Sequence, residues 1–161
     1  MIILIECVVL CLVFTLMVCI MAKNPIATLY NYPPKIQERV KSLDEYKGKI
    51  PTNKNKVVAK TFAALMIVII VSVILRYVNG YTTFNEAFFT SVIIWTVVNV
   101  YDVVVMDIIW FCHDTRFRFK GTEDIKTEYK NYMFHIKEGL KGEIIGISVC
   151  ILIGLVVHFI L

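Results

Sequence analysis

Residues 87–112 read AFFTSVIIWTVVNVYDVVVMDIIWFC and form the third of four long apolar stretches in the chain. The stretch exceeds the roughly 20 residues that an α-helix needs to cross a bilayer. Two carboxylates, Asp102 and Asp107, nevertheless lie inside it. Because a carboxylate at the centre of a bilayer costs about 2.5–3.5 kcal/mol on insertion scales, such residues are usually functional. The stretch therefore predicts a membrane-spanning helix with one polar face.

Three further apolar stretches flank this one, at residues 2–21, 57–78 and 144–161. The chain of 161 residues is 58% hydrophobic and has a mean hydropathy of +0.70, which is typical of an integral membrane protein. No Gly-rich or Ser-rich linker divides it. We therefore expect an all-α fold with one polytopic domain over residues 1–161 and four transmembrane helices in a compact bundle.

The basic residues predict how this bundle lies in the membrane. Fifteen of the 17 Lys and Arg residues lie in two loops, eight in residues 22–56 and seven in residues 113–142. Because cytoplasmic loops carry an excess of Lys and Arg, we expect both loops in the cytoplasm and both termini outside. The membrane would be a plasma membrane or a bacterial inner membrane.

Both loops also contain apolar residues at helical spacing. Ile36, Val40 and Leu43 recur among basic residues in the first loop. In the second loop an apolar stripe begins after Gly121-Thr122 and comprises Ile125, Tyr129, Tyr132, Met133, Ile136 and Leu140. These patterns predict amphipathic helices that lie on the inner leaflet, and a solvated loop helix is the alternative.

The net charge of +4 comes from residues that flank the apolar stretches. Attraction to anionic lipid headgroups explains such a distribution more simply than binding to nucleic acid does. The residues that we expect to contact headgroups are Arg116, Arg118, Lys126, Lys130 and Lys137.

The polar residues of the third stretch gather on one side when they are projected onto an α-helix at about 100° per residue. Asn99, Asp102 and Asp107 share an arc that continues into His113 and Asp114, whereas valines and isoleucines cover the opposite side. Because Asp102 and Asp107 are five positions apart, the projection places them at opposite edges of the arc. The helix would run from outside to inside, so the arc is expected to open toward the cytoplasm.

A divalent metal is a candidate cofactor. His113, Asp114, Glu128 and His135 are side chains of the types that bind such ions. They do not repeat at the spacing of a helical metal motif, so only folding could bring them together. The alternative is that these are ordinary interfacial His and acidic residues.

Small residues follow one another at every fourth position in the last apolar stretch: Gly142, Gly146, Cys150 and Gly154. Such a ridge lets two membrane helices approach closely. It predicts either a seam between copies in a homo-oligomer or helix packing within one chain.

Three classes of function are compatible with this pattern. The first is a membrane protein that binds or passes a cation, a proton or a small solute at the inward-opening acidic site, because intramembrane carboxylates are common in ion pathways. The second is a membrane-embedded enzyme that acts on a lipid-borne substrate at the inner leaflet. The third is a structural or accessory subunit whose carboxylates are satisfied by a partner protein.

Overall fold

The protein is helical throughout the part of the chain that the structure describes. The computed structural model describes residues 2–161, with the exception of the side chains of residues 53–56, 59 and 60. It is 81% helical, and no strand occurs among the described residues, so the expected all-α class is confirmed. The elements in chain order are α1 (Ile2–Met21), η1 (Pro25–Asn31), α2 (Pro34–Ser42), η2 (Asp44–Tyr46), α3 (Asn53–Tyr77), α4 (Phe84–Tyr101), η3 (Asp102–Phe111), η4 (Thr115–Phe117), η5 (Glu123–Lys130) and α5 (Tyr132–Phe159).

Three helices are long and apolar enough to cross a membrane, which suggests a membrane location. They are α1, the continuous helix formed by α4 and η3 (Phe84–Phe111), and α5. In α3, the apolar helix within the described residues covers Thr61–Tyr77 and is shorter. A fourth span at residues 57–78 therefore stays a prediction.

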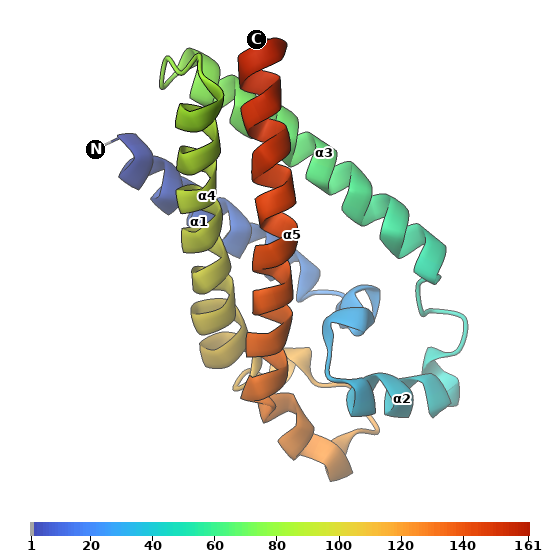
Figure 1. Ribbon diagram of the computed structural model, residues 1–161. Coiled ribbons are helices and arrows are strands. Elements are labelled where there is room, and N and C mark those ends of the chain that lie inside the picture. The colour runs from blue at the N-terminus through green and yellow to red at the C-terminus, as the bar shows by residue number, and fades with distance from the viewer. Residues whose placement is uncertain (1) are drawn as a thin grey trace.

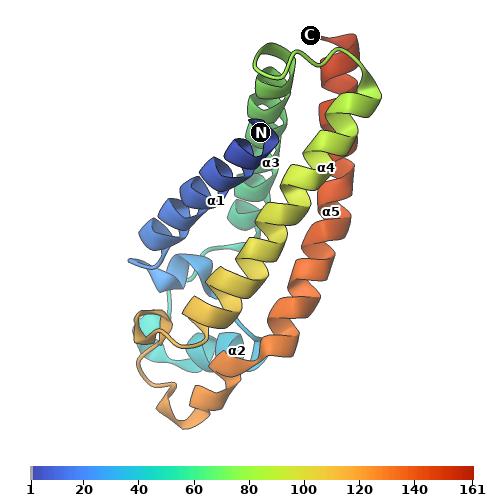
Figure 2. The ribbon, with the colours of Figure 1, turned by 90° about the vertical axis from the view of Figure 1, so that its left-hand side faces the viewer.

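The helices are arranged around an antiparallel pair. Helices α4 and α5 run side by side along the length of the molecule, while α1 and α3 are inclined to them (Figures 1 and 2). Helix α3 packs mainly against α5 and diverges from it toward its own N-terminal end (Figure 1). The short helices gather at the end of the molecule opposite the C-terminus (Figure 1).

Small residues on α5 allow the close contact between α5 and α4. A Cβ atom added at Gly146 would lie 1.9 Å from the indole Nε1 of Trp95, and one at Gly154 would lie 2.8 Å from the ring of Phe84. Real Cβ atoms do not approach other atoms so closely, so these positions require glycine. The ridge is thus filled by α4 of the same chain. This contact agrees with the alternative of helix packing within one chain, and the homo-oligomer seam through Gly142, Gly146, Cys150 and Gly154 stays a prediction.

The start of α4 is set by a capping box. The Thr83 hydroxyl accepts a hydrogen bond from the Glu86 backbone N–H, and the Glu86 carboxylate accepts one from the Thr83 backbone N–H. These bonds satisfy backbone donors that a helix end leaves free. The helix therefore begins at Phe84, three residues before the apolar stretch that the sequence indicates.

The apolar face of α2 is covered by protein. Ile36 and Val40 have no exposed surface, and they join an aromatic cluster made of Leu29, Tyr32, Ile36, Val40, Phe111, Cys112, Phe117, Phe119 and Tyr129. Ion pairs from Lys35 to Glu128 and from Arg39 to Asp124 hold the outer face of α2 against η5. The predicted placement of this apolar face on the inner leaflet is therefore wrong, because the aromatic cluster covers it.

The apolar stripe of the second loop does not form one continuous helix. It is divided between η5, which buries Tyr129, and α5, which begins at Tyr132. The break occurs at Asn131, whose side chain accepts a hydrogen bond from the Phe134 backbone N–H and so caps a new helix. From Tyr132 the helix runs without interruption to Phe159, since no proline lies between them.

Candidate functional site

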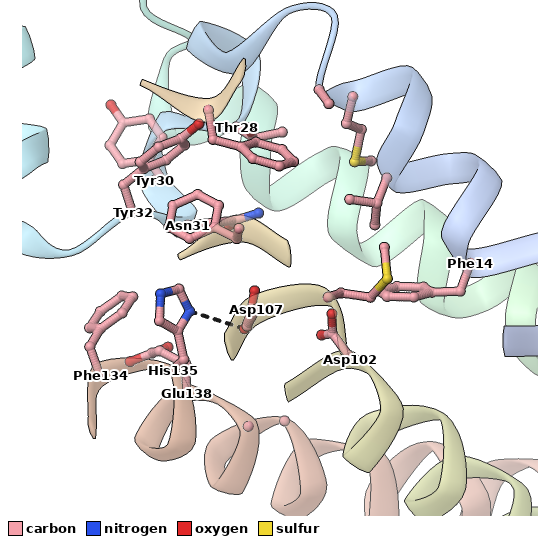
Figure 3. Close-up of a pocket in the computed structure, with 18 of the residues that line it drawn as sticks. Phe14, Thr28, Tyr30, Asn31, Tyr32, Asp102, Asp107, Phe134, His135 and Glu138 are labelled. Carbon is pink, nitrogen blue, oxygen red and sulfur yellow. Dashed lines mark ion pairs between the residues drawn. The ribbon is translucent and has the colours of Figure 1, made fainter. Parts of the chain in front are cut away.

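A cavity of about 620 Å³ lies between α1, η1, η3 and the first turns of α5 (Figure 3). Its lining includes Asn99, Asp102 and Asp107, three of the five residues predicted for an ion- or ligand-binding site. Two further polar residues, His135 and Glu138, line it from α5. The cavity is therefore the place where the polar face of the third apolar helix meets the rest of the chain.

A π-helix brings Asp102 and Asp107 to the same side. The backbone leaves the α-helical register after Tyr101 and stays π-helical over η3, Asp102–Phe111. Because each turn of a π-helix is closed by an i→i+5 hydrogen bond, residues five positions apart lie roughly above one another. Both carboxylates therefore line one cavity (Figure 3). The expectation that they lie at opposite edges of a polar arc assumed α-helical geometry and is corrected by this register.

The Asp102 carboxylate has no fixed partner. It lines the cavity, and it forms no hydrogen bond or ion pair with any described residue. A carboxylate inside an apolar segment is strongly disfavoured unless it binds a proton, a cation or a hydrogen-bond donor. Asp102 is therefore the group in this cavity that is free to take a ligand.

Asp107, in contrast, is paired with a histidine from α5. Its Oδ2 lies 3.1 Å from Nδ1 of His135, and Figure 3 shows the two side chains pointing toward each other. The imidazole is only 2% exposed and packs edge-on against the rings of Phe111 and Phe134, at centroid distances of 5.1 and 5.3 Å. This packing fixes the ring so that one nitrogen faces the carboxylate.

Asn99 belongs to a second polar contact that the sequence analysis missed. Its amide Nδ2 donates to Oε2 of Glu143 over 2.8 Å and to the Gly139 carbonyl oxygen over 3.1 Å. The Thr96 hydroxyl donates to Oε1 of the same glutamate over 2.5 Å. Glu143 lies between the predicted loop at 113–142 and the apolar stretch at 144–161, and the sequence analysis gave it no role. Its spacing from Gly146, three residues away, could have placed it on the α5 face that meets α4.

His113 and Asp114, the other two predicted site residues, lie outside the cavity. The ring Nδ1 of His113 faces the carbonyl oxygens of Ile108 and Ile109, at 3.1 and 3.0 Å. Asp114 caps η4 by accepting a hydrogen bond from the Arg116 backbone N–H, and it also accepts one from the Trp110 indole over 2.6 Å. The chain turns away from the cavity after Phe111, so the continuous arc expected from the sequence ends there.

The Arg116 guanidinium and the hydrogen bonds to Asp114 hold the pKa of this carboxyl well below its ordinary value of 3.8. The ionised form therefore stabilises the folded protein above that pH, and this contribution is lost as the pH falls below it. We expect Asp114→Asn to lower the free energy of unfolding at pH 7 by at most about 1 kcal/mol, because the Arg116 side chain of the ion pair is 66% exposed and water screens the interaction.

The same variant should lose less stability than the wild-type protein between about pH 5 and pH 2, since it has no such carboxylate to protonate. Thermal unfolding followed by circular dichroism in an uncharged detergent would measure both effects. Equal acid losses for the two proteins would contradict this assignment.

The four predicted metal ligands are not brought together. His135 pairs with Asp107, Glu128 with Lys35 and Asp114 with Arg116, while His113 faces backbone carbonyls. Among the described residues, no group of three or more His, Cys, Asp or Glu side chains is arranged to hold a metal ion.

Of the five residues predicted to contact headgroups, the three lysines are exposed, whereas the two arginines contact other residues of the chain. Lys126, Lys130 and Lys137 are exposed on η5 and α5. Arg116 is exposed but paired with Asp114, at 2.6 Å. Arg118 lies over the ring of Tyr129, 4.1 Å from its centroid, and donates to the Cys112 carbonyl oxygen over 2.6 Å. Partial burial lowers the pKa of the Arg118 guanidinium, because it removes water from the cation.

The fold and the cavity together define a helical protein with three helices suited to crossing a membrane and an acidic cavity beside one of them. No protein-family model, curated protein or solved structure matches the chain. The function is therefore argued from the cavity itself.

Proposed function

We propose that this protein binds or passes a cation, a proton or a small solute at an acidic site that opens toward the cytoplasm. The observation that carries the proposal is Asp102, a carboxylate within an apolar helix that lines a cavity and has no partner among the described residues. A protein that used this carboxylate only for packing would be expected to satisfy it with an internal donor, as it does for Glu143.

The proposed topology has four spans, with α3 as the additional one, and with both termini outside a plasma membrane or bacterial inner membrane. The two basic loops support it, because they lie at the same end of the molecule, opposite the C-terminus (Figure 1). Lys126, Lys130 and Lys137 would meet anionic headgroups of the inner leaflet at that end. The cavity, which is lined partly by the first loop, would then face the cytoplasm.

The test is ion flux through reconstituted protein. We expect proteoliposomes that contain the wild-type chain to show a proton or alkali-cation flux well above that of protein-free vesicles. Asp102→Asn should abolish the flux, because the amide cannot carry the charge or the proton. Vesicles with an enclosed pH-sensitive dye under an imposed proton gradient would measure proton flux, and vesicles with enclosed Na⁺- or K⁺-sensitive dyes under gradients of those ions would measure alkali-cation flux.

The matched control is Asp44→Asn, which changes the net charge equally at an exposed residue paired only with Lys47. This variant should conduct like the wild type. A flux that persists unchanged in Asp102→Asn, with the variant folded, would contradict the proposal.

The second candidate is the membrane-embedded enzyme. It is favoured by the Asp107–His135 pair, since a histidine held by a carboxylate is the arrangement that general bases use. Both residues line the cavity, where the headgroup of a lipid-borne substrate would have to enter. If the protein is an enzyme, we expect no flux but a modified lipid in the same vesicles, which mass spectrometry would detect.

If the protein is an accessory subunit, we expect neither flux nor a modified lipid. It should instead co-purify with a larger partner.

A further inference from the structure

The cavity has the size of a site for an organic molecule. Its volume of about 620 Å³ lies within the range of roughly 300–1,000 Å³ that is typical of small-molecule pockets. A bare metal ion is held differently, by several ligand atoms at about 2.0–2.6 Å. No cluster of three such ligands occurs among the described residues. The volume, together with the lack of a metal-ligand cluster among the described residues, therefore favours a larger ligand.

The walls of the cavity are mostly apolar and adaptable. Aromatic rings and methionines line it from three helices: Phe14, Met17 and Met21 from α1, Met106 and Phe111 from η3, and Phe134 from α5. Methionine side chains are flexible and polarizable, so they fit ligands of varied shape. Met17 and Met21 are also 46% and 44% exposed. One wall of the cavity is formed by α1, a helix that is long and apolar enough to cross a membrane.

The charges around the cavity favour one positive charge in the ligand. Asp107 is engaged by His135, and the exposed Glu138 is paired with Lys141 at 2.5 Å. Asp102 forms no ion pair of its own among the described residues, although the His135 imidazole lies near enough to interact with it electrostatically. No Lys or Arg side chain is present in the described lining. A single cationic group beside an apolar body would satisfy both Asp102 and the walls.

We propose that the ligand of this cavity is a monovalent organic cation with an apolar body, whose charge pairs with Asp102 while its apolar part contacts the Phe and Met side chains. This inference rests on the proposed function and specifies the class of cation. An amine, quaternary ammonium or phosphonium of this kind partitions into membranes, which agrees with a cavity walled on one side by α1.

The test is binding of tetraphenylphosphonium, a permanent cation with an apolar body, to the purified full-length chain in an uncharged detergent. We expect saturable binding by isothermal titration calorimetry. Asp102→Asn should weaken the affinity at least about tenfold, because removing one charge of a desolvated pair is costly. Asp44→Asn, which alters the net charge equally outside the cavity, should bind like the wild type.

A neutral probe tests the charge requirement without any substitution. Methyltriphenylphosphonium and triphenylphosphine oxide both carry three phenyl rings on phosphorus, but only the first is a cation. The neutral oxide should bind the wild-type protein at least about tenfold more weakly than methyltriphenylphosphonium. This comparison remains valid if Asp102→Asn fails to fold.

The outcomes separate this inference from the proposed function. Equal binding of tetraphenylphosphonium by Asp102→Asn, or equal binding of the neutral probe, would overturn the organic-cation inference. Absence of binding together with an Asp102-dependent proton or alkali-cation flux would overturn it as well, but would leave the proposed function standing. Absence of both binding and flux would contradict the two proposals together.

Discussion

Gly146→Leu should prevent stable folding, with a loss of at least about 3 kcal/mol in the free energy of unfolding. The first added carbon alone would lie 1.9–2.4 Å from three atoms of the Trp95 indole. Relieving that overlap requires either a rotation of the indole or a separation of α4 and α5, which make the most extensive contact in the molecule. The remaining atoms of leucine would then need space that the interface lacks.

A graded series on the same ridge separates steric overlap from helix propensity. Alanine is favoured over glycine inside a helix by about 0.5–1 kcal/mol. At Gly142 an added Cβ would meet only Asn99 Oδ1, at 3.2 Å, so Gly142→Ala should change stability little. Gly146→Ala should instead be destabilising, and Gly146→Leu more so.

Unfolding in SDS, followed by circular dichroism, would rank these variants. Equal stability of Gly142→Ala and Gly146→Ala would show that α4 and α5 do not pack as described here. A folded, monodisperse Gly146→Leu protein on gel filtration would have the same implication.

His135→Ala should lower the free energy of unfolding by about 3 kcal/mol. Breaking a buried ion pair by removing one partner costs about 3–5 kcal/mol, because the other charge is left uncompensated. We expect a loss at the lower end of this range, because the Asp107 side chain is 30% exposed and water can solvate its charge in part. The loss of the ring also leaves a void between Phe111 and Phe134, which it contacts edge-on.

The chain provides its own control for this substitution. His113 is an exposed histidine whose ring faces only backbone carbonyls and Tyr132, so His113→Ala should change stability by no more than about 0.5 kcal/mol. A double-mutant cycle of His135→Ala with Asp107→Asn would measure the coupling between the two residues. A coupling near zero, or equal losses for the two histidines, would show that the pair does not form.

Three residues that the sequence predicts on the polar face of the third apolar helix, Asn99, Asp102 and Asp107, line the cavity. The residues that pair with Asp107 and Asn99 were not predicted. His135 was considered as a metal ligand and not as the partner of Asp107, and Glu143 was given no role. Both lie on α5, about 30 to 45 positions further along the chain, and no local pattern indicates which residues of one helix face another.

Hydropathy and charge within the sequence determined the helical class and the three helices suited to a membrane, because apolar segments of this length bury their backbone polar groups only as helices. The tertiary structure alone decided the rest. It placed the face of α2 under the aromatic cluster and the glycine ridge of α5 against Trp95. It also set the π-helical register that brings Asp102 and Asp107 into one cavity. The physical reason is that periodicity shows which residues share a face on an ideal helix, whereas the register and the partner of that face depend on packing between segments far apart in the chain.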